Sequence, residues 1–318
     1  RVGRQQNGIL YEYVGPGEGA YAPTERLPQP TQQRLFDVQA AVDPLPGVTL
    51  FGEWARSLND QNRLSSLDAA DNRDEAYTAG LRVAPVPLDV GRRSLGTLSA
   101  DVQREQRGTH FVTFNPVRPL DFARTWNLER RGSGLTTALS NAGDETTDEA
   151  TLAWAWTERS RVSADVGRLT VGDAFESWRR GGRVQLSEPG VPRLDLRTTL
   201  VTSSDRLANT EGAWLRQQAT IRQPVWRGRF TPAVTLEHER RRQRTAGADS
   251  LLDPSFAFVR LRPGVQYQTG PLEASASVAF RTEDEALDGR LQDASTAWTV
   301  QSGVAWTPSR TFDVRADG

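Results

Sequence analysis

The sequence predicts an all-β protein. We expect an antiparallel up-and-down meander of about sixteen strands that forms a transmembrane β-barrel, closed or as an incomplete, curved part of one. Three features of the 318 residues support this fold. Apolar and polar residues alternate, short turns recur at similar intervals, and tryptophans lie near the ends of the expected strands.

The alternation is clearest in 272–280. The apolar positions are Leu272, Ala274, Ala276, Val278 and Phe280, and Glu273, Ser275 and Ser277 lie between them. A period of two is typical of a strand whose two faces meet different surroundings. We expect the apolar set to face lipid and the polar set to face the interior of a barrel.

Short turns punctuate the chain from residue 35 onward. Gly, Pro or charged residues mark them near 45, 87, 119, 160, 190, 228, 270 and 308. Longer polar stretches lie between them, at 58–76, 129–149, 202–212, 237–254 and 281–296. Tight turns at one end and long loops at the other are typical of outer-membrane barrels. At roughly ten residues per strand, eight turns imply about sixteen strands.

The first part of the chain differs from the rest. Residues 1–34 are rich in Gly and Pro and show no period, so we expect an irregular arm or linker there and the barrel in 35–318. The chain has no initiating Met and ends at Gly318 within an expected strand. We therefore expect edge strands near 35–43 and 310–316, and further strands beyond Gly318 in the intact protein.

The composition excludes several classes of protein. The 39 basic residues, all Arg, nearly balance 40 acidic ones, so nucleic acid is not an expected partner. Cys is absent, which excludes disulfides and thiolate metal sites. No run of 18 apolar residues could form a transmembrane helix.

Tryptophan placement favours a membrane over water. Trp298 and Trp306 share one face of an expected strand and lie ~26 Å apart along it. A tilt of ~40° reduces this to about 20 Å along the membrane normal, close to the height of a band between aromatic girdles. The same pattern would suit core residues of a soluble sheet. Other tryptophans near strand ends are Trp54, Trp126, Trp214 and Trp226.

The residues from 35 to 318 resemble large outer-membrane β-barrels of Gram-negative bacteria, especially those of the Bacteroidota. The likeness rests on the hairpin cadence and on the stretches 90–96 (VGRRSLG) and 166–169 (VGRL). It implies a cell outer membrane location and a pore, transporter or secretion/assembly component. Membrane lipid, including lipopolysaccharide, is then the expected partner, with a secreted protein or small solute as cargo. Many such barrels end on an aromatic residue, which this chain lacks.

One loop is rich in oxygen ligands. Asp60, Asn62, Asp68, Asp71 and Asp74 could surround a calcium ion, which takes six to eight oxygens. The spacing departs from an EF-hand, because Ser65 occupies the glycine position and no Glu stands at position 12. A solvated, turn-rich loop is the preferred interpretation, so we predict no metal or cofactor site.

Catalytic signals are weak. Only His110 and His238 could serve as imidazole bases, and neither lies in a nucleophile elbow or a two-histidine zinc motif. We therefore predict no catalytic residues and no enzyme. The run 239–244 (ERRRQR) could attract polyanions, but we interpret it as an extracellular loop whose arginines pair with carboxylates or with lipopolysaccharide phosphates.

The leading functional hypothesis is thus an outer-membrane pore, transporter or secretion/assembly component. The alternative is a soluble or cell-surface β-sheet protein that binds glycans or proteins through long charged loops. The transported solute and the oligomeric state are not encoded in any motif.

Overall fold

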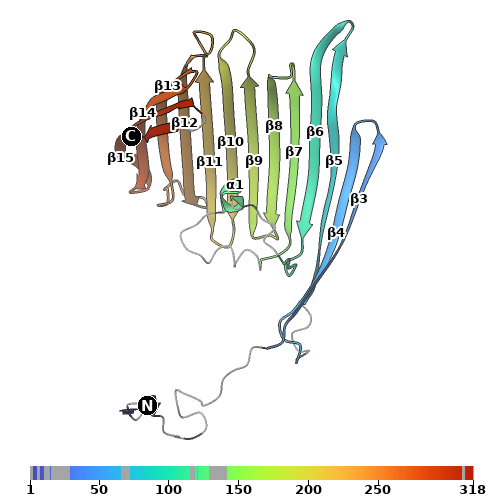
Figure 1. Cartoon of the computed structure of the whole chain (residues 1–318). Coiled ribbons are helices and arrows are strands. Elements are labelled where there is room, and N and C mark those ends of the chain that lie inside the picture. Colours follow the sequence, from blue (N-terminus) through green and yellow to red (C-terminus); the bar gives the residue numbers. More distant parts are fainter. Residues whose placement is uncertain are drawn as a thin grey trace.

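The computed structural model describes residues 3–5, 8–10, 15, 29–65, 72–114, 119, 121–128, 142–309 and 312–317. Nearly all of these residues lie in one antiparallel meander of fourteen strands, in the order β16 to β3 (Figure 1). The all-β antiparallel fold predicted from the alternation is confirmed. Two further short strands, β1 (Gly3–Gln5) and β2 (Gly8–Leu10), pair only with each other among the described residues.

The strands of the main sheet pair with their neighbours in sequence. They are β3 (Gln32–Leu45), β4 (Val48–Asp60), β5 (Arg73–Val90), β6 (Arg93–Arg107), β7 (Glu145–Ala155), β8 (Arg161–Val171), β9 (Phe175–Leu186), β10 (Arg193–Asp205), β11 (Thr210–Arg222), β12 (Phe230–Thr245), β13 (Phe256–Thr269), β14 (Leu272–Leu287), β15 (Arg290–Ser309) and β16 (Phe312–Asp317).

The sheet is open. It curves strongly (Figure 1), and its two edges are β3 and β16, which do not pair with each other in the described part of the chain. The edges lie where we expected them, and the sheet is the incomplete, curved form of the predicted fold. Lateral backbone N–H and C=O groups of these edge strands are available for further pairing.

Two of the expected short turns are wrong. Pro85 and Pro87 lie inside β5, and the chain reverses instead at Gly91, which has φ +64°. Register shifts between Val83 and Val86 and between Pro87 and Asp89 accommodate prolines that have no N–H to donate to the ladder.

The described residues around 119, which are 111–114, 119 and 121–128, include no hairpin. The chain from 108 to 144 connects β6 to β7 and includes the short helix α1 (Phe122–Thr125). Within the described residues, the main sheet has fourteen strands instead of the expected number of about sixteen.

Three of the expected long loops are largely strand. The stretch 202–212 contains only the short connection 206–209, and the first half of 237–254 belongs to β12. The stretch 281–296 reverses at Asp288 and Gly289, whose φ values of +50° and +76° are typical of a type I′ hairpin turn. The strands therefore continue into these charged stretches. The connections at the two ends of the sheet differ less in length than we expected.

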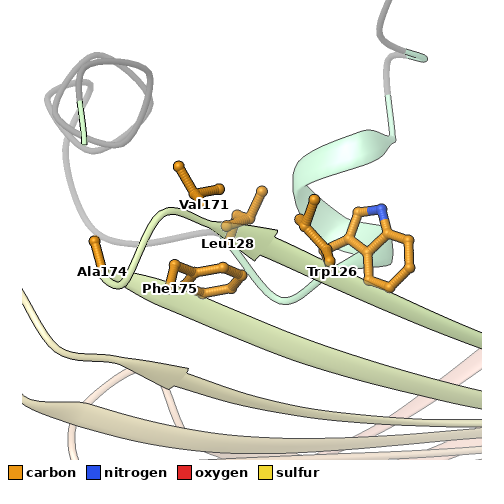
Figure 2. Close-up of a cluster of buried hydrophobic side chains, with 6 residues drawn as sticks. Trp126, Leu128, Val171, Ala174 and Phe175 are labelled. Carbon is orange, nitrogen blue, oxygen red and sulfur yellow. The ribbon is translucent and has the colours of Figure 1, made fainter. Parts of the chain in front are cut away.

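The helix α1 and the residues after it pack on one face of the sheet. Trp126 is 2 % exposed and forms a buried cluster with Leu128, Leu169, Val171 and Phe175 (Figure 2). Any Cβ at position 167 would lie 2.7 Å from the Trp126 ring, so Gly167 is required for this close approach. The cluster fixes α1 over the middle of the sheet, close to one end of the strands (Figure 1).

Candidate functional site

The two faces of the sheet have opposite characters. We call the face that carries α1 the polar face, and the opposite one the apolar face. Arg124 reaches Glu239 of β12 at 3.3 Å and Asn127 reaches Ser203 of β10 at 2.9 Å, which places these residues on the polar face. Because side chains alternate, the cross-strand pairs then assign every strand residue to a face.

The apolar face is covered by exposed hydrophobic side chains from β3 to β15. Trp298 and Val300 are each 70 % exposed, although both belong to a continuous ladder. Other exposed members of this face are Val38, Val42, Leu50, Trp54, Tyr77, Val102, Leu152, Trp154, Val166, Leu196, Ile221, Val234, Leu236, Val259, Leu261, Val278, Val304 and Trp306. We call this surface the apolar belt.

Buried hydrophobic residues are few by comparison. Within the described ranges, the buried apolar side chains are Ala55, Trp126, Leu128, Leu169, Val171, Ala174, Phe175, Val201, Trp214 and Ala279. A soluble domain of this length normally buries a large apolar core. In the described part of the chain, many large apolar side chains lie instead on one open surface.

The apolar belt crosses the strands obliquely. In β3 it is centred near Ala40, and the row of cross-strand partners that begins there passes Ala79 and Trp178 and ends at Arg242 in β12. In β12 the apolar stretch is Phe230–Leu236, roughly nine residues away from Arg242 along the strand. With ~3.3 Å per residue and ~4.8 Å between strands, this shift corresponds to strands tilted by about 35° from the normal to the belt.

Aromatic side chains occur at the borders of the belt. Trp306 and Leu272 are partners at one border of the apolar stretch 272–280, and the Trp298 ring lies 4.7 Å from that of Phe280 at its other border, midway along β14 and β15. In β4 and β5, Trp54 and Tyr77 are partners on the same face. Trp126 and Trp214 do not follow this pattern, since each is 2 % exposed on the polar face. Their expected place near strand ends on a membrane surface is wrong.

The polar face is divided by charge. Carboxylates predominate on β3–β7, namely Asp37, Glu53, Asp74, Asp101, Glu105, Glu145 and Glu149 against Arg82 and Arg107. Arginines predominate on β8–β12, namely Arg161, Arg179, Arg183, Arg193, Arg197, Arg216, Arg222 and Arg241 against Asp165, Asp195, Asp205, Glu237 and Glu239. Alternation within single strands does not show this division, because the cross-strand register decides which residues of successive strands share a face.

Arginines and tryptophan meet where α1 contacts the sheet. The guanidinium carbons of Arg124, Arg216 and Arg241 lie 5.5, 5.1 and 4.7 Å from the centre of the Trp214 ring. The indole N–H of Trp214 donates to Glu239 at 2.7 Å, and Glu239 also pairs with Arg124. These cation–π and charged hydrogen bonds hold several positive charges close together beside one buried carboxylate.

The arginine-rich run 239–244 is not a loop. It lies in β12, where alternation sends Arg241 and Glu239 to the polar face and Arg240, Arg242 and Arg244 to the apolar face, beyond the end of the belt. Among the pairs seen there, Arg244 contacts Glu211 at 3.1 Å. The expectation of a loop, which rested on the charge of this run, is wrong. A charged run can form a strand because long arginine side chains reach water from it.

The oxygen-rich loop is only partly within the described residues, since Asp68 and Asp71 lie outside them. Asp60 accepts the backbone N–H of Asn62 at 3.0 Å, and Asp74 accepts that of His110 at 2.7 Å. These carboxylates cap backbone donors, and no cluster of three or more metal-ligating side chains occurs in the part of the chain described.

The two histidines lie in different settings. His238 projects from the apolar face of β12, where its Nδ1 is 3.0 Å from the amide oxygen of Gln217. His110 lies in the connection after β6, where its backbone N–H is bound by Asp74.

No described helix is both long enough and apolar enough to cross a membrane.

One turn carries an electrostatic feature of its own. Between β9 and β10, the carboxylate of Glu188 accepts hydrogen bonds from the hydroxyls of Ser160 and Thr157. These hydrogen bonds, with the Ser160 bond as the larger cause, lower the pKa of Glu188 below its usual value.

Comparisons with known proteins give a distant likeness in structure. No family model matches the sequence, and no curated protein is significantly similar to it. The chain is similar to a triple mutant of Rhodopseudomonas blastica porin, with 10% identity and a TM-score of 0.31 over 90% of this chain and 84% of that one. A structure titled "Asymmetric conductivity of engineered proteins" gives the same values. At this level the function has to be inferred from the side chains of the chain itself.

Proposed function

We propose that this chain is an outer-membrane β-barrel protein that acts as a pore for small charged solutes. The apolar belt supports a lipid-facing surface, because soluble monomers rarely expose a continuous apolar patch larger than a few hundred Å². Exposed apolar side chains such as Trp298, Val300 and Val304 are unfavourable in water. They carry no such cost in the hydrocarbon of a bilayer.

The oblique course of the belt is the observation that carries the proposal. A tilt of about 35° between the strands and the normal to the belt falls within the 35–45° typical of outer-membrane barrels. A bilayer has two parallel boundaries, so tilted strands must place their apolar residues at positions that shift steadily from strand to strand. A patch that binds a protein partner would not have to cross thirteen of the strands in this way.

The polar face supports a pore among the possible membrane functions. Every strand from β3 to β14 contributes polar or charged side chains to it, and α1 packs on it. Such a wall can remain in contact with water when the opposite face meets lipid. In the membrane, β3 and β16 are expected to pair with one another or with further strands, since each unpaired backbone group in lipid costs several kcal/mol.

We further propose anionic lipid, such as lipopolysaccharide, as a partner of the apolar face. Arg240 and Arg242 extend from β12 just beyond the belt, at the level expected for lipid phosphates. Replacing both with Gln should reduce the amount of lipid A that remains bound in native mass spectrometry. Equal retention by the wild type and the double variant would contradict this partner.

Extraction and conductance test the main proposal. The full chain should require detergent, should migrate faster on gels before heating than after, and should produce discrete conductance steps in planar bilayers. A protein that is monodisperse in buffer without detergent would instead support the alternative of a soluble or surface β-sheet protein. If the protein requires detergent but produces no conductance, the membrane location would still be supported and the pore activity would be refuted.

A further inference from the structure

We propose that the polar face carries a binding site for small anions, built around Arg124, Arg197 and Arg216. This inference rests on the proposed pore and specifies the solutes that its wall would bind. These three arginines, with Thr199, Glu237 and Glu239, line a cavity of about 260 Å³ beneath α1. The relevant chemical group is a carboxylate or a phosphate, both of which match the planar guanidinium.

The carboxylates of the cavity are already paired. Glu239 is bound by Arg124 at 3.3 Å and by the indole N–H of Trp214 at 2.7 Å. Glu237 pairs with Arg260 at 3.6 Å. Among the residues that the structure describes, no carboxylate lies within ion-pairing distance of Arg197 or Arg216. The cavity therefore has two guanidinium groups left to bind an anion.

The packing around Trp214 keeps Arg216 in place. Its guanidinium carbon lies 5.1 Å from the centre of the ring, beside those of Arg124 and Arg241. Grouping like charges in this way is unfavourable for folding, and an anion would relieve the repulsion. Because the stacked guanidinium is already ordered, an anion would bind with little further loss of side-chain entropy.

The arginines continue along the same face beyond this cavity. Arg197 also borders a second cavity of about 670 Å³, which includes Arg193 and Arg222. Arg193 and Arg222 are direct cross-strand partners, an arrangement of like charges that destabilises a sheet. Arg216, Arg197 and this pair thus continue the positive charge along β10 and β11, where the intervening Asp195 is paired with Arg183 at 2.6 Å. An anion could pass along them from one site to the next.

A titration of the refolded full chain in detergent micelles tests the site without requiring a pore. Inorganic phosphate and, separately, acetate would be added at constant ionic strength while tryptophan emission is recorded, with Trp214→Phe identifying the signal of Trp214. We expect saturable binding of at least one of the two anions. Arg197→Gln combined with Arg216→Gln should weaken it about tenfold or more, since each substitution removes charged hydrogen bonds. Arg180→Gln is the matched control, because Arg180 projects from the apolar face of β9.

The outcomes separate the two proposals. Saturation by phosphate alone identifies a phosphoryl site, by acetate alone a carboxylate site, and by both a general anion site. The proposal is refuted if neither anion saturates, or if the double variant binds as tightly as the wild type. In planar bilayers, the double variant should lower the chloride-to-potassium permeability ratio and Arg180→Gln should not. A wild type that does not conduct would refute the pore, whereas the micelle titration would still decide the anion site.

Discussion

Placing an arginine at position 276 tests which face of the sheet meets lipid. Ala276 lies midway along the apolar stretch 272–280 of β14, and its cross-strand partners Val265 and Ser302 share its face. At ~3.3 Å per residue, it is about 13 Å along the strand from Leu272 and from Phe280. With the tilt of about 35°, this distance is about 11 Å along the membrane normal, so Ala276 lies near the midplane of a band ~25 Å tall.

Ala276→Arg should therefore lower the free energy of unfolding by about 2–4 kcal/mol. Leu272→Arg lies at the border of the belt, beside Trp306, and should lose only ~0–1 kcal/mol from its charge. The control is Ser275→Arg, which adds the same side chain to the exposed polar face one residue away. A cost that falls with distance from position 276 is specific to a bilayer.

The assay is reversible unfolding in urea after refolding into phospholipid vesicles, with the fraction folded read from the heat-dependent gel shift. The free energies of unfolding of the arginine variants at 272, 275 and 276 would be compared, provided that the variants show the same slope of this free energy against urea concentration. If Arg is tolerated equally at 275 and 276, the assignment of the faces is wrong. If Arg costs as much at 272 as at 276, the belt does not mark a membrane boundary.

Three further predictions concern local features. Trp126→Ala removes a ring that is 2 % exposed and should cost about 3–5 kcal/mol in denaturant unfolding, whereas Trp226→Ala, 74 % exposed in a turn, should change little. Gly289→Val places a branched residue at φ +76° and against Ser250, so it should destabilise the β14–β15 hairpin by about 1–2 kcal/mol or more, seen as faster amide exchange there. The lowered pKa of Glu188 means that its stabilising effect is present above its usual pKa of 4.5 and is lost as the pH falls through the lower folded value. The unfolding midpoints of the wild type and of Glu188→Gln should therefore differ at neutral pH and converge in acid, and a constant difference would contradict this.

Much of the fold could be predicted from the sequence, because the alternation of side chains is a local property of an extended backbone. Leu272 to Phe280 showed which residues share a face before any partner strand was known. Turn positions were less certain. Pro85 and Pro87 resembled a turn but lie in bulges of β5, and the Asp288–Gly289 turn was hidden within a stretch that looked like a charged loop. Local composition does not distinguish a polar loop from a strand whose polar residues extend beyond a membrane.

The candidate site could not be predicted from the sequence in the same way. Arg124, Arg197 and Arg216 are far apart along the chain, and nothing in their spacing indicates that they line one cavity. Trp126 and Trp214 looked like membrane-surface residues until the packing of α1 placed them on the polar face.

The sequence by itself determined that the chain forms an antiparallel meander with one apolar and one polar face, since both follow from periodicity within single strands. Only the tertiary structure decided how the strands are offset from each other. That offset gives the apolar belt its slope, and long-range packing brings Arg124 of α1 over Trp214. Register and long-range packing depend on pairings between strands, and those pairings are not a property of any one segment.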